Sequence, residues 1–206
     1  MKIIAAVDKN WGIGYKGGLL CSIPEDKKRF RDLTIGNTVI MGRKTLQSLP
    51  GGKILEGREN IVLSKSGISK SGVNISGVTK NGVNISDVTK NGVTKSGVSK
   101  SGVAEAEGAV FCASITELHA YLKPSGFDNA FVIGGQEIYE LFINFCAVAY
   151  ITHIDASFQA DRYFPDITGM SGWKIENESP PMKYKDLSYK YVKYINLRVL
   201  SMIDDN

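Results

Sequence analysis

The sequence has little of what metal centres and disulfide frameworks are made from. Its 206 residues include two histidines and three cysteines, and Cys21, Cys112 and Cys146 are widely spaced, without a Cys-x-x-Cys pair. This pattern fits neither a structural zinc site nor a disulfide framework, so we expect no metal and reduced thiols. We interpret His119 as a surface residue and His153 as a packed or sheet-edge residue.

Long apolar runs are also missing. The opening run MKIIAAV is too short for the core of a signal peptide and leads directly into Asp8 and Lys9, and no later stretch is long enough to cross a bilayer. We therefore expect a cytoplasmic protein that is not attached to a membrane. With 43% hydrophobic and 22% charged residues, the chain is predicted to form one domain over residues 1–206.

The formal net charge of +4 is concentrated in one segment. Residues 64–103 hold six lysines and one acidic residue, so they carry +5 and the rest of the chain carries about −1. These lysines are not interleaved with the aromatic residues on which nucleic-acid bases stack. We therefore expect no nucleic-acid partner.

The same segment is repetitive. Residues 64–103 form eight units of five residues, each ending in Val or Ile, and seven of the units contain Gly. A period of five matches neither a helix nor a strand, and Gly weakens both. The segment is either a flexible surface arm or an ordered coil with every fifth residue pointing inward, as in the pentapeptide-repeat family, which the units resemble. We predict an insertion that interrupts the domain and is either tolerated or used for self-association.

Outside this insertion, apolar runs alternate with helical patterns. Strands are predicted at residues 1–7, 38–42, 60–64, 109–113, 129–135 and 147–154, and helices at 24–33, 43–49, 114–122 and 136–145. Such alternation predicts an α/β fold with a mostly parallel sheet covered on both faces. Near the C-terminus, segments 173–179 and 189–200 predict an antiparallel hairpin at the sheet edge. We expect a mixed sheet of about eight strands and about four flanking helices.

One acidic residue lies on an apolar helix face. Asp26 shares a stripe with Phe30 and Leu33 at helical spacing. Burying a carboxylate costs free energy unless a partner satisfies it, so a polar ligand with two donors is one explanation. The other explanation is that Asp26 only favours the helix dipole in the first turn. The pattern alone leaves both open.

Three glycine-rich segments lie where strands end. In residues 38–45 and 131–142, glycine separates a strand from a helix, a position where backbone N–H groups bind phosphate. Two such turns in one parallel sheet favour a dinucleotide cofactor. Residues 12–17 match Gly-x-Gly-x-x-Gly, but a loop follows instead of a helix. We interpret that segment as a mobile strip across the mouth of a site.

Six blocks, in this order, resemble the dihydrofolate reductase family: IAAVDKNWGIG (4–14), IPEDKKRFRDLT (23–34), VIMGRKTLQSLP (39–50), GRENIVLS (57–64), VIGGQEIYELF (132–142) and YITHIDASFQADRYFPD (150–166). The resemblance covers nearly the whole chain outside 65–103. It implies the dihydrofolate-reductase-like fold and NADPH-dependent reduction of 7,8-dihydrofolate to tetrahydrofolate, a reaction of one-carbon metabolism. It also implies hydride transfer to C6 and protonation of N5 from water.

The resemblance implies roles for individual residues. Asp26 takes the place of the catalytic carboxylate that pairs with N3 and the 2-amino group of the pterin. The implied substrate contacts are Ile4, Ala5, Phe30, Leu49, Leu55, Arg58 at the glutamate tail, Ile133, and Thr152, which supports Asp26 through water. The implied cofactor contacts are Ala6, Ile13, Gly14, Gly42, Arg43, Lys44, Thr45, Leu63, Ser64, Lys65, Gly134, Gly135, Gln136, Glu137, Ile138 and Tyr139. Residues 12–21 become a lid, which Asp161 steadies when closed.

Two features depart from the family pattern. Leu20-Cys21 stands where the family commonly has Pro-Trp, so the hydrogen bond of a Trp near the pterin is missing, and the insertion begins beside the expected adenosine end of the cofactor. Two other functions stay open. One is a pterin or riboflavin-pathway reductase of the same fold, although Asp26 matches the folate branch. The other is an assembly or docking protein that uses the fold through residues 64–103.

Overall fold

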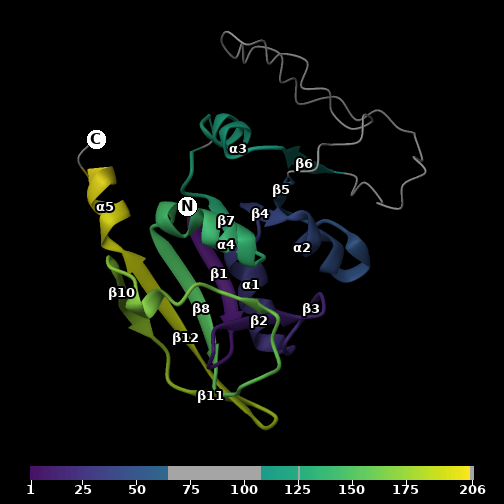
Figure 1. The fold of residues 1–206 in the computed structure, drawn as a ribbon, viewed down its shortest axis with the longest axis vertical. Coiled ribbons are helices and arrows are strands. Elements are labelled where there is room, and N and C mark those ends of the chain that lie inside the picture. Colours follow the sequence, from purple (N-terminus) through teal and green to yellow (C-terminus); the bar gives the residue numbers. More distant parts are fainter. Residues whose placement is uncertain (65–107, 125, 205–206) are drawn as a thin grey trace.

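The structure is a computed structural model that describes residues 1–64, 108–124 and 126–204. The expectations for the repeat insertion beyond Ser64, and for Lys65, lie outside these residues. Figure 1 shows the fold, an α/β arrangement around a sheet of nine strands in the order β10-β12-β8-β1-β7-β4-β5-β6, with β11 paired to β12. The predicted fold class is therefore confirmed.

Six strands form the parallel part of the sheet, and all six were predicted to within one residue. They are β1 (Lys2–Val7), β4 (Thr38–Gly42), β5 (Glu59–Leu63), β6 (Ala109–Cys112), β7 (Ala130–Gly134) and β8 (Val148–Ile154). Their residues are mostly buried, because helices cover both faces of a parallel sheet. This explains why they appear in the sequence as continuous apolar runs.

Four helices match the prediction, and a fifth was missed. The predicted ones are α1 (Pro24–Thr34), α2 (Arg43–Ser48), α3 (Ile115–Leu122) and α4 (Gln136–Phe142), which continues as a 3-10 turn over Ile143–Phe145. The predicted strand 189–200 is wrong at its end, because the chain becomes α5 (Leu197–Asp204). The Asn196 carboxamide oxygen accepts a hydrogen bond from Arg198 N at 3.2 Å, which favours a helix start there.

The C-terminal strands run antiparallel, as predicted, but with one strand more. β10 (Trp173–Glu178) pairs with the second half of β12 (Leu187–Asn196), and the short β11 (Met182–Tyr184) forms the hairpin with its first half. β12 in turn pairs with β8 along seven residue pairs, Ile154 to Val148. This register brings Tyr191 opposite Thr152, next to the site described below.

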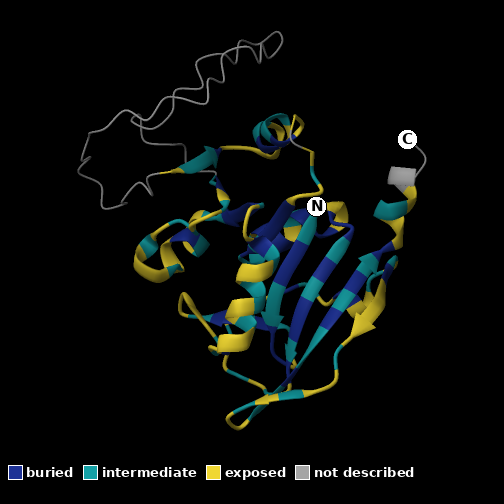
Figure 2. Ribbon diagram, turned by 180° about the vertical axis from the view of Figure 1, so that it is seen from behind, coloured by how far each residue is buried: buried dark blue, intermediate teal, exposed yellow. Residues whose placement is uncertain are grey.

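The two faces of the sheet have separate cores. α3 and α4 pack on one face through Leu118, Ile138 and Phe142, while α1 and α2 pack on the other, where Leu46 is buried and Phe30 is partly buried. In Figure 2 α1 lies across its face of the sheet with its outer surface exposed. Asp26 is on the inner side of α1, where it is partly buried.

A smaller sheet lies beside the C-terminal end of β1. It consists of β2 (Gly12–Tyr15), β3 (Gly18–Leu19) and β9 (Arg162–Tyr163), in the order β3-β2-β9. No helix of the described residues is long and apolar enough to cross a membrane. The three cysteines are free.

Candidate active site

Asp26 lies in the first turn of α1 and contacts the sheet. Thr152 Oγ1, on β8, donates a hydrogen bond to Asp26 Oδ1 at 2.5 Å. Sequence reasoning expected a water between them, but the bond is direct. Burial raises the pKa of the Asp26 carboxyl above its ordinary value, while the Thr152 hydrogen bond and the positive charge of Arg29 partly oppose this shift. Asp26 is therefore a desolvated carboxylate with one fixed partner.

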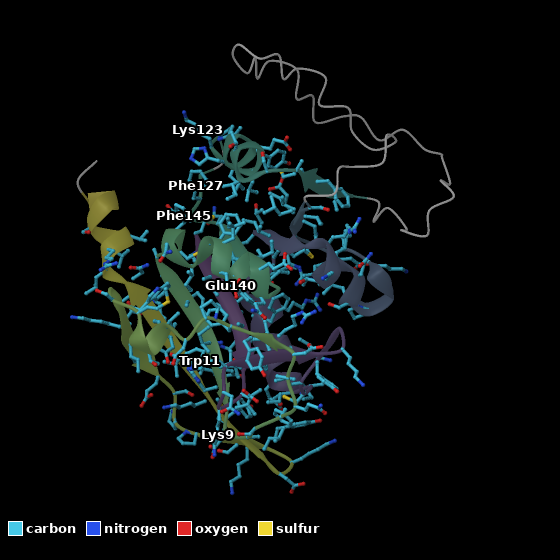
Figure 3. The ribbon with its side chains drawn as sticks, viewed as in Figure 1. Lys9, Trp11, Lys123, Phe127, Glu140 and Phe145 are labelled. Atoms are coloured by element: carbon cyan, nitrogen blue, oxygen red, sulfur yellow. The ribbon has the colours of Figure 1, made fainter. Side chains whose placement is uncertain are left out.

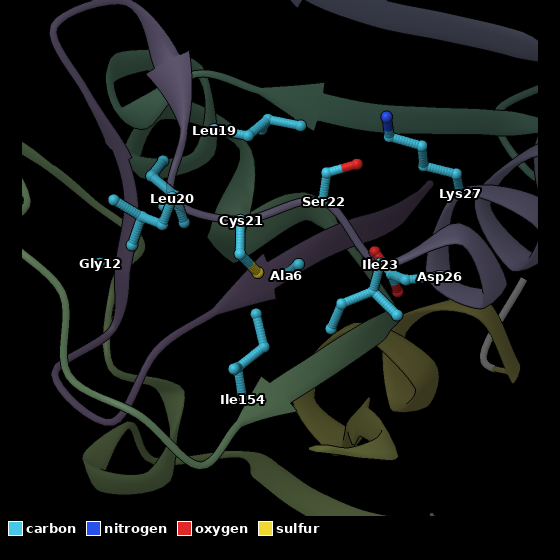
Figure 4. Close-up of a pocket in the computed structure, with 11 residues that line it drawn as sticks. Ala6, Gly12, Leu19, Leu20, Cys21, Ser22, Ile23, Asp26, Lys27 and Ile154 are labelled. Carbon is cyan, nitrogen blue, oxygen red and sulfur yellow. The ribbon is translucent and has the colours of Figure 1, made fainter. Parts of the chain in front are cut away.

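A small cavity opens in front of Asp26. Figure 4 shows Cys21, Ile154 and Ala6 around it, with the Asp26 carboxylate at its edge. Ile13 also lines the cavity. Two of the predicted cofactor contacts, Ala6 and Ile13, thus share a cavity with the predicted catalytic residue, and its walls are mostly apolar.

Most of the residues predicted to line the pterin and aminobenzoyl pocket lie together on the α1 side of the sheet. Ile4 is buried in the core cluster there, and partly buried residues pack against that cluster: Phe30, Leu49, Leu55 and Ile133. Ala5 is different, because alternate residues of a strand face opposite sides and its side chain joins the cluster on the other face. The Ala5 side chain therefore does not belong to this wall.

Arg58 lies near the far end of α1. Its Nη1 donates to Thr34 Oγ1 at 3.2 Å, its Nε donates to the Glu56 carbonyl at 3.1 Å, and its guanidinium carbon is 5.8 Å from the centre of the Phe30 ring. It forms no ion pair with any described acidic side chain. Its charge is thus available next to the apolar wall, as a site for the glutamate tail requires.

The two predicted glycine turns, residues 42–45 and 134–136, are neighbours. They follow the paired strands β4 and β7, and neither helix start has a side-chain cap. A Cβ on Gly135 would lie 3.3 Å from Thr45 Oγ1, and one on Gly42 would lie 3.1 Å from Ile138 Cγ1. The glycines therefore allow the two turns to pack closely, so that two helix starts lie side by side. The first N–H groups of a helix have no partner within the helix.

Tyr139 and Gln136 have internal partners that the sequence did not predict. The Tyr139 hydroxyl is buried and donates to the Ile4 carbonyl at 2.8 Å, so it is not available to a ribose. Gln136 Oε1 accepts from Tyr163 N at 3.0 Å, and its Nε2 donates to Glu140. These hydrogen bonds help to position α4. At the start of α4 the groups that could contact a phosphate are therefore backbone groups, not the side chains of Gln136 and Tyr139.

The remaining predicted cofactor contacts differ in exposure. Arg43, Lys44 and Glu137 are exposed and Ile138 is buried. Leu63 is the last residue of β5 and Ser64 follows it, and Ser64 N donates to the Cys112 carbonyl at 3.0 Å. The exposed cations thus stand at the start of α2, whereas the Ile138 side chain belongs to the core.

The predicted lid, residues 12–21, is a short β-hairpin in this structure. No helix follows its glycines, in agreement with the rejection of a dinucleotide fingerprint there. Asp161 N donates to the Gly14 carbonyl at 3.0 Å, and Lys16 N donates to Asp161 Oδ2 at 3.1 Å. The predicted contact between Asp161 and this segment is therefore present.

Two residues that sequence reasoning missed support the site. Asp8 is buried, and its carboxylate accepts hydrogen bonds from Asn10 N, Gly12 N and Phe158 N. An acid directly after a strand and before Asn and Gly was the available signal. The other is Arg29, which is half-buried.

Aromatic residues beside the hairpin of residues 12–21 form a connected group. The Trp11 and His153 rings meet edge-on at 5.1 Å between centres, Trp11 stacks on Phe164 at 6.0 Å, and Phe164 meets Tyr139 at 4.8 Å. Figure 3 shows Trp11 on the same side of the sheet as α4, which carries Glu140. The packed position predicted for His153 is confirmed, and His119 is exposed as predicted.

Comparisons with known proteins agree with this arrangement. A family model described as dihydrofolate reductase matches residues 1–97 and 93–196. Among curated proteins, the chain is 29% identical over 191 residues to the dihydrofolate reductase of Buchnera aphidicola, covering 93% of this chain and 94% of that protein. It is also 29% identical over 198 residues to the dihydrofolate reductase of Neisseria gonorrhoeae, covering 94% of this chain and 96% of that one.

Other relatives are longer than this chain. A bifunctional dihydrofolate reductase-thymidylate synthase of Glycine max is 27% identical over 213 residues, which cover 96% of this chain and 34% of that protein, so the chain spans about a third of its length. Among solved structures, dihydrofolate reductase from Enterococcus faecalis complexed with NADP(H) and RAB-propyl superposes with a TM-score of 0.67 at 25% identity, covering 94% of each chain.

Proposed function

The chain belongs to the dihydrofolate reductase family, and from this premise we propose that it reduces 7,8-dihydrofolate to 5,6,7,8-tetrahydrofolate with NADPH. The observation that carries the proposal is the desolvated Asp26 carboxylate, bound by Thr152 at the edge of an apolar cavity. A carboxylate in this position accepts two parallel hydrogen bonds from N3 and the 2-amino group of a pterin.

The chain's own residues fit the cofactor. The two uncapped helix starts, with the exposed Arg43 and Lys44 beside them, suit a pyrophosphate and a further phosphate, which favours NADPH over NADH. Ala6 and Ile13 would meet the nicotinamide end, while Leu63 and Ser64 would lie toward the adenosine end. NADPH, when bound, supplies the hydride that reaches C6 of the substrate.

The protein's part in the reaction is to bind, orient and exclude water. Asp26 holds the pterin by its edge and stabilises positive charge as N5 takes a proton, and Thr152 holds Asp26. An apolar wall excludes water from the substrate, and it consists of Ile4, Phe30, Leu49, Leu55 and Ile133. Arg58 binds the glutamate carboxylate of the substrate. Since none of these side chains is assigned to N5, water is the proposed proton donor there, and alignment of the reacting carbons supplies most of the rate.

NADPH oxidation with dihydrofolate, measured for the parent and Asp26→Asn, tests this function. The Asn side chain has nearly the same shape but no charge and only one acceptor, so we expect kcat/KM at pH 7 to fall about 100-fold. Comparable rates for the two proteins contradict the role of Asp26. Turnover of a riboflavin-pathway substrate instead of dihydrofolate favours the related reductase.

Urea unfolding separates loss of chemistry from loss of fold. Because burial raises the folded-state pKa of Asp26, the carboxylate opposes folding once the pH rises through that pKa. Asp26→Asn is therefore expected to be at least as stable as the parent at pH 8, and the difference should shrink toward acid pH.

We propose that residues 64–103 are a tolerated insertion into a single domain. A variant in which a Gly-Ser linker replaces residues 65–103 is expected to keep reductase activity, provided that the linker is long enough to return from the end of β5 to the start of its parallel neighbour β6. Loss of a partner or of self-association in this variant, with activity intact, supports the docking alternative. We also propose a cytoplasmic location, because free thiols are typical of proteins in a reducing compartment.

A further inference from the structure

Arg29 is the basic residue of α1 that turns toward the sheet. It follows Asp26 by three residues, one helical turn, and is half-buried. Its guanidinium carbon lies 4.1 Å from the centre of the Tyr191 ring and 5.7 Å from that of Tyr150. The side chain is therefore held over two rings of the sheet surface instead of extending into solvent.

The Arg29 guanidinium has no acidic partner within the described part of the chain. Its Nη1 atom is buried and without a hydrogen bond, and no described carboxylate forms an ion pair with it. Half-buried cations ordinarily find a partner, because desolvation without one costs free energy. The contact with the Tyr191 ring stabilises the guanidinium, but the buried Nη1 atom is left without a hydrogen-bond partner.

The sheet register places this charge beside Asp26. Thr152 on β8 is directly paired with Tyr191 on β12. Thr152 donates a hydrogen bond to Asp26, and the Tyr191 ring lies under the guanidinium of Arg29. Two charges of opposite sign, one helical turn apart, thus rest on adjacent sheet positions without touching. In a site with little water such charges interact over several ångströms, and Arg29 lowers the pKa of Asp26 against the effect of burial.

We propose that Arg29 is a positioning residue for the catalytic carboxylate: its guanidinium, held on Tyr191 and left without an acidic partner, keeps Asp26 in the charged form that binds the pterin. This inference rests on the proposed role of Asp26. The other groups near Asp26 do not supply this charge. Burial raises the pKa of the Cys21 thiol and, to about 12, that of Tyr191, so both are neutral at pH 7, and Lys27 is exposed.

Carbon-13 NMR of the apoprotein, labelled at aspartate carboxyl carbons, tests the inference without requiring activity. The signal of Asp26 is assigned as the one that Asp26→Asn removes. In Arg29→Gln the Asp26 signal is expected to titrate at higher pH than in the parent, because a stabilising positive charge is gone. Arg29→Lys keeps the charge and should restore the titration toward that of the parent.

Lys28→Gln is the matched control. Lys28 is on the same helix, carries the same charge and pairs on the surface with Asp32 at 2.6 Å, so its loss should leave the Asp26 titration unchanged. Identical Asp26 titrations in the parent and Arg29→Gln overturn the inference. A purely structural role for Arg29 predicts that result together with lower stability in urea.

Two further measurements keep the test decisive. If Arg29→Gln does not fold, Tyr191→Leu keeps the cation but removes the ring beneath it, and the Asp26 titration should again move to higher pH; an unmoved titration overturns the inference. If Arg29→Gln folds, its KM for dihydrofolate should rise more at pH 6 than at pH 8, whereas Arg29→Lys should show less of this change. If the parent protein does not reduce dihydrofolate, the proposed function is wrong. The titration of the Asp26 carboxyl tests the role of Arg29 separately, because it does not require activity.

Discussion

At the proposed substrate end of the site, a single partly buried side chain with a definite partner would carry the chemistry, since Asp26 is bound directly by Thr152. At the cofactor end, the chain offers backbone at two glycine turns, with exposed cations beside them. The difference shows what each end tolerates. Changing one functional group should disable the substrate end, whereas the cofactor end should tolerate loss of a charge but not the addition of a carbon atom.

The largest effect is expected from Gly134→Ala at the cofactor end. Gly134 has φ of 109°, and a Cβ there would lie 2.8 Å from the Tyr139 ring, which the core holds in place. We expect about 3 kcal/mol of lost stability and loss of NADPH binding, measured by urea unfolding and fluorescence titration. Gly36→Ala, at φ of 73° with open space around it, is the control and should cost about 1 kcal/mol. Equal costs would show that backbone conformation alone matters.

Thr152→Val should have an intermediate effect at the substrate end. The variant keeps the shape of the side chain but removes the donor to Asp26 Oδ1, and a hydrogen bond to a charged group is worth about 1.5–3 kcal/mol. We expect roughly a tenfold fall in kcat/KM. Because the lost bond lowers the pKa of Asp26, that pKa should rise and the loss of activity should be greatest at low pH. Thr152→Ser, which keeps the hydroxyl, should retain activity.

The smallest effect is expected from Lys44→Met. Lys44 is exposed at the start of α2, where a surface cation contributes about 0.3–1 kcal/mol to phosphate binding. KM for NADPH should rise about two- to fivefold at low salt and less at high salt, while kcat stays the same. Lys174→Met, on the distant β10, controls for net charge. A loss as large as that of Thr152→Val would mean that side chains specify both ends alike.

Local sequence patterns predicted the elements but not the contacts between them. The parallel strands follow from short apolar runs, and α3 begins as expected at Ser114, whose side chain accepts from Glu117 N. Asp26 was found because helical spacing puts it on the stripe of Phe30 and Leu33. Its bond to Thr152 links residues 126 positions apart, a pairing that the family resemblance indicated and the spacing of residues could not.

Two contacts that the sequence did not predict have a common origin in tertiary register. The Tyr139 hydroxyl is used by Ile4, 135 positions away, and Arg29 faces Tyr191 only because β12 pairs with β8 at that residue. Neither contact leaves a mark in the surrounding sequence. The end of β12 depends instead on one side chain, because Asn196 begins α5 where the alternation of the strand appeared to continue.

The Asp8 carboxylate holds together two loops that are far apart in the sequence. It accepts Asn10 N and Gly12 N from the segment after β1, and Phe158 N from the segment before β9. Asp161 adds a second connection between the same loops. In chimeras made between this chain and its relatives, the two loops therefore form one exchangeable unit. Recombination that takes residues 8–21 from one parent and 155–163 from another would separate groups that have to be inherited together.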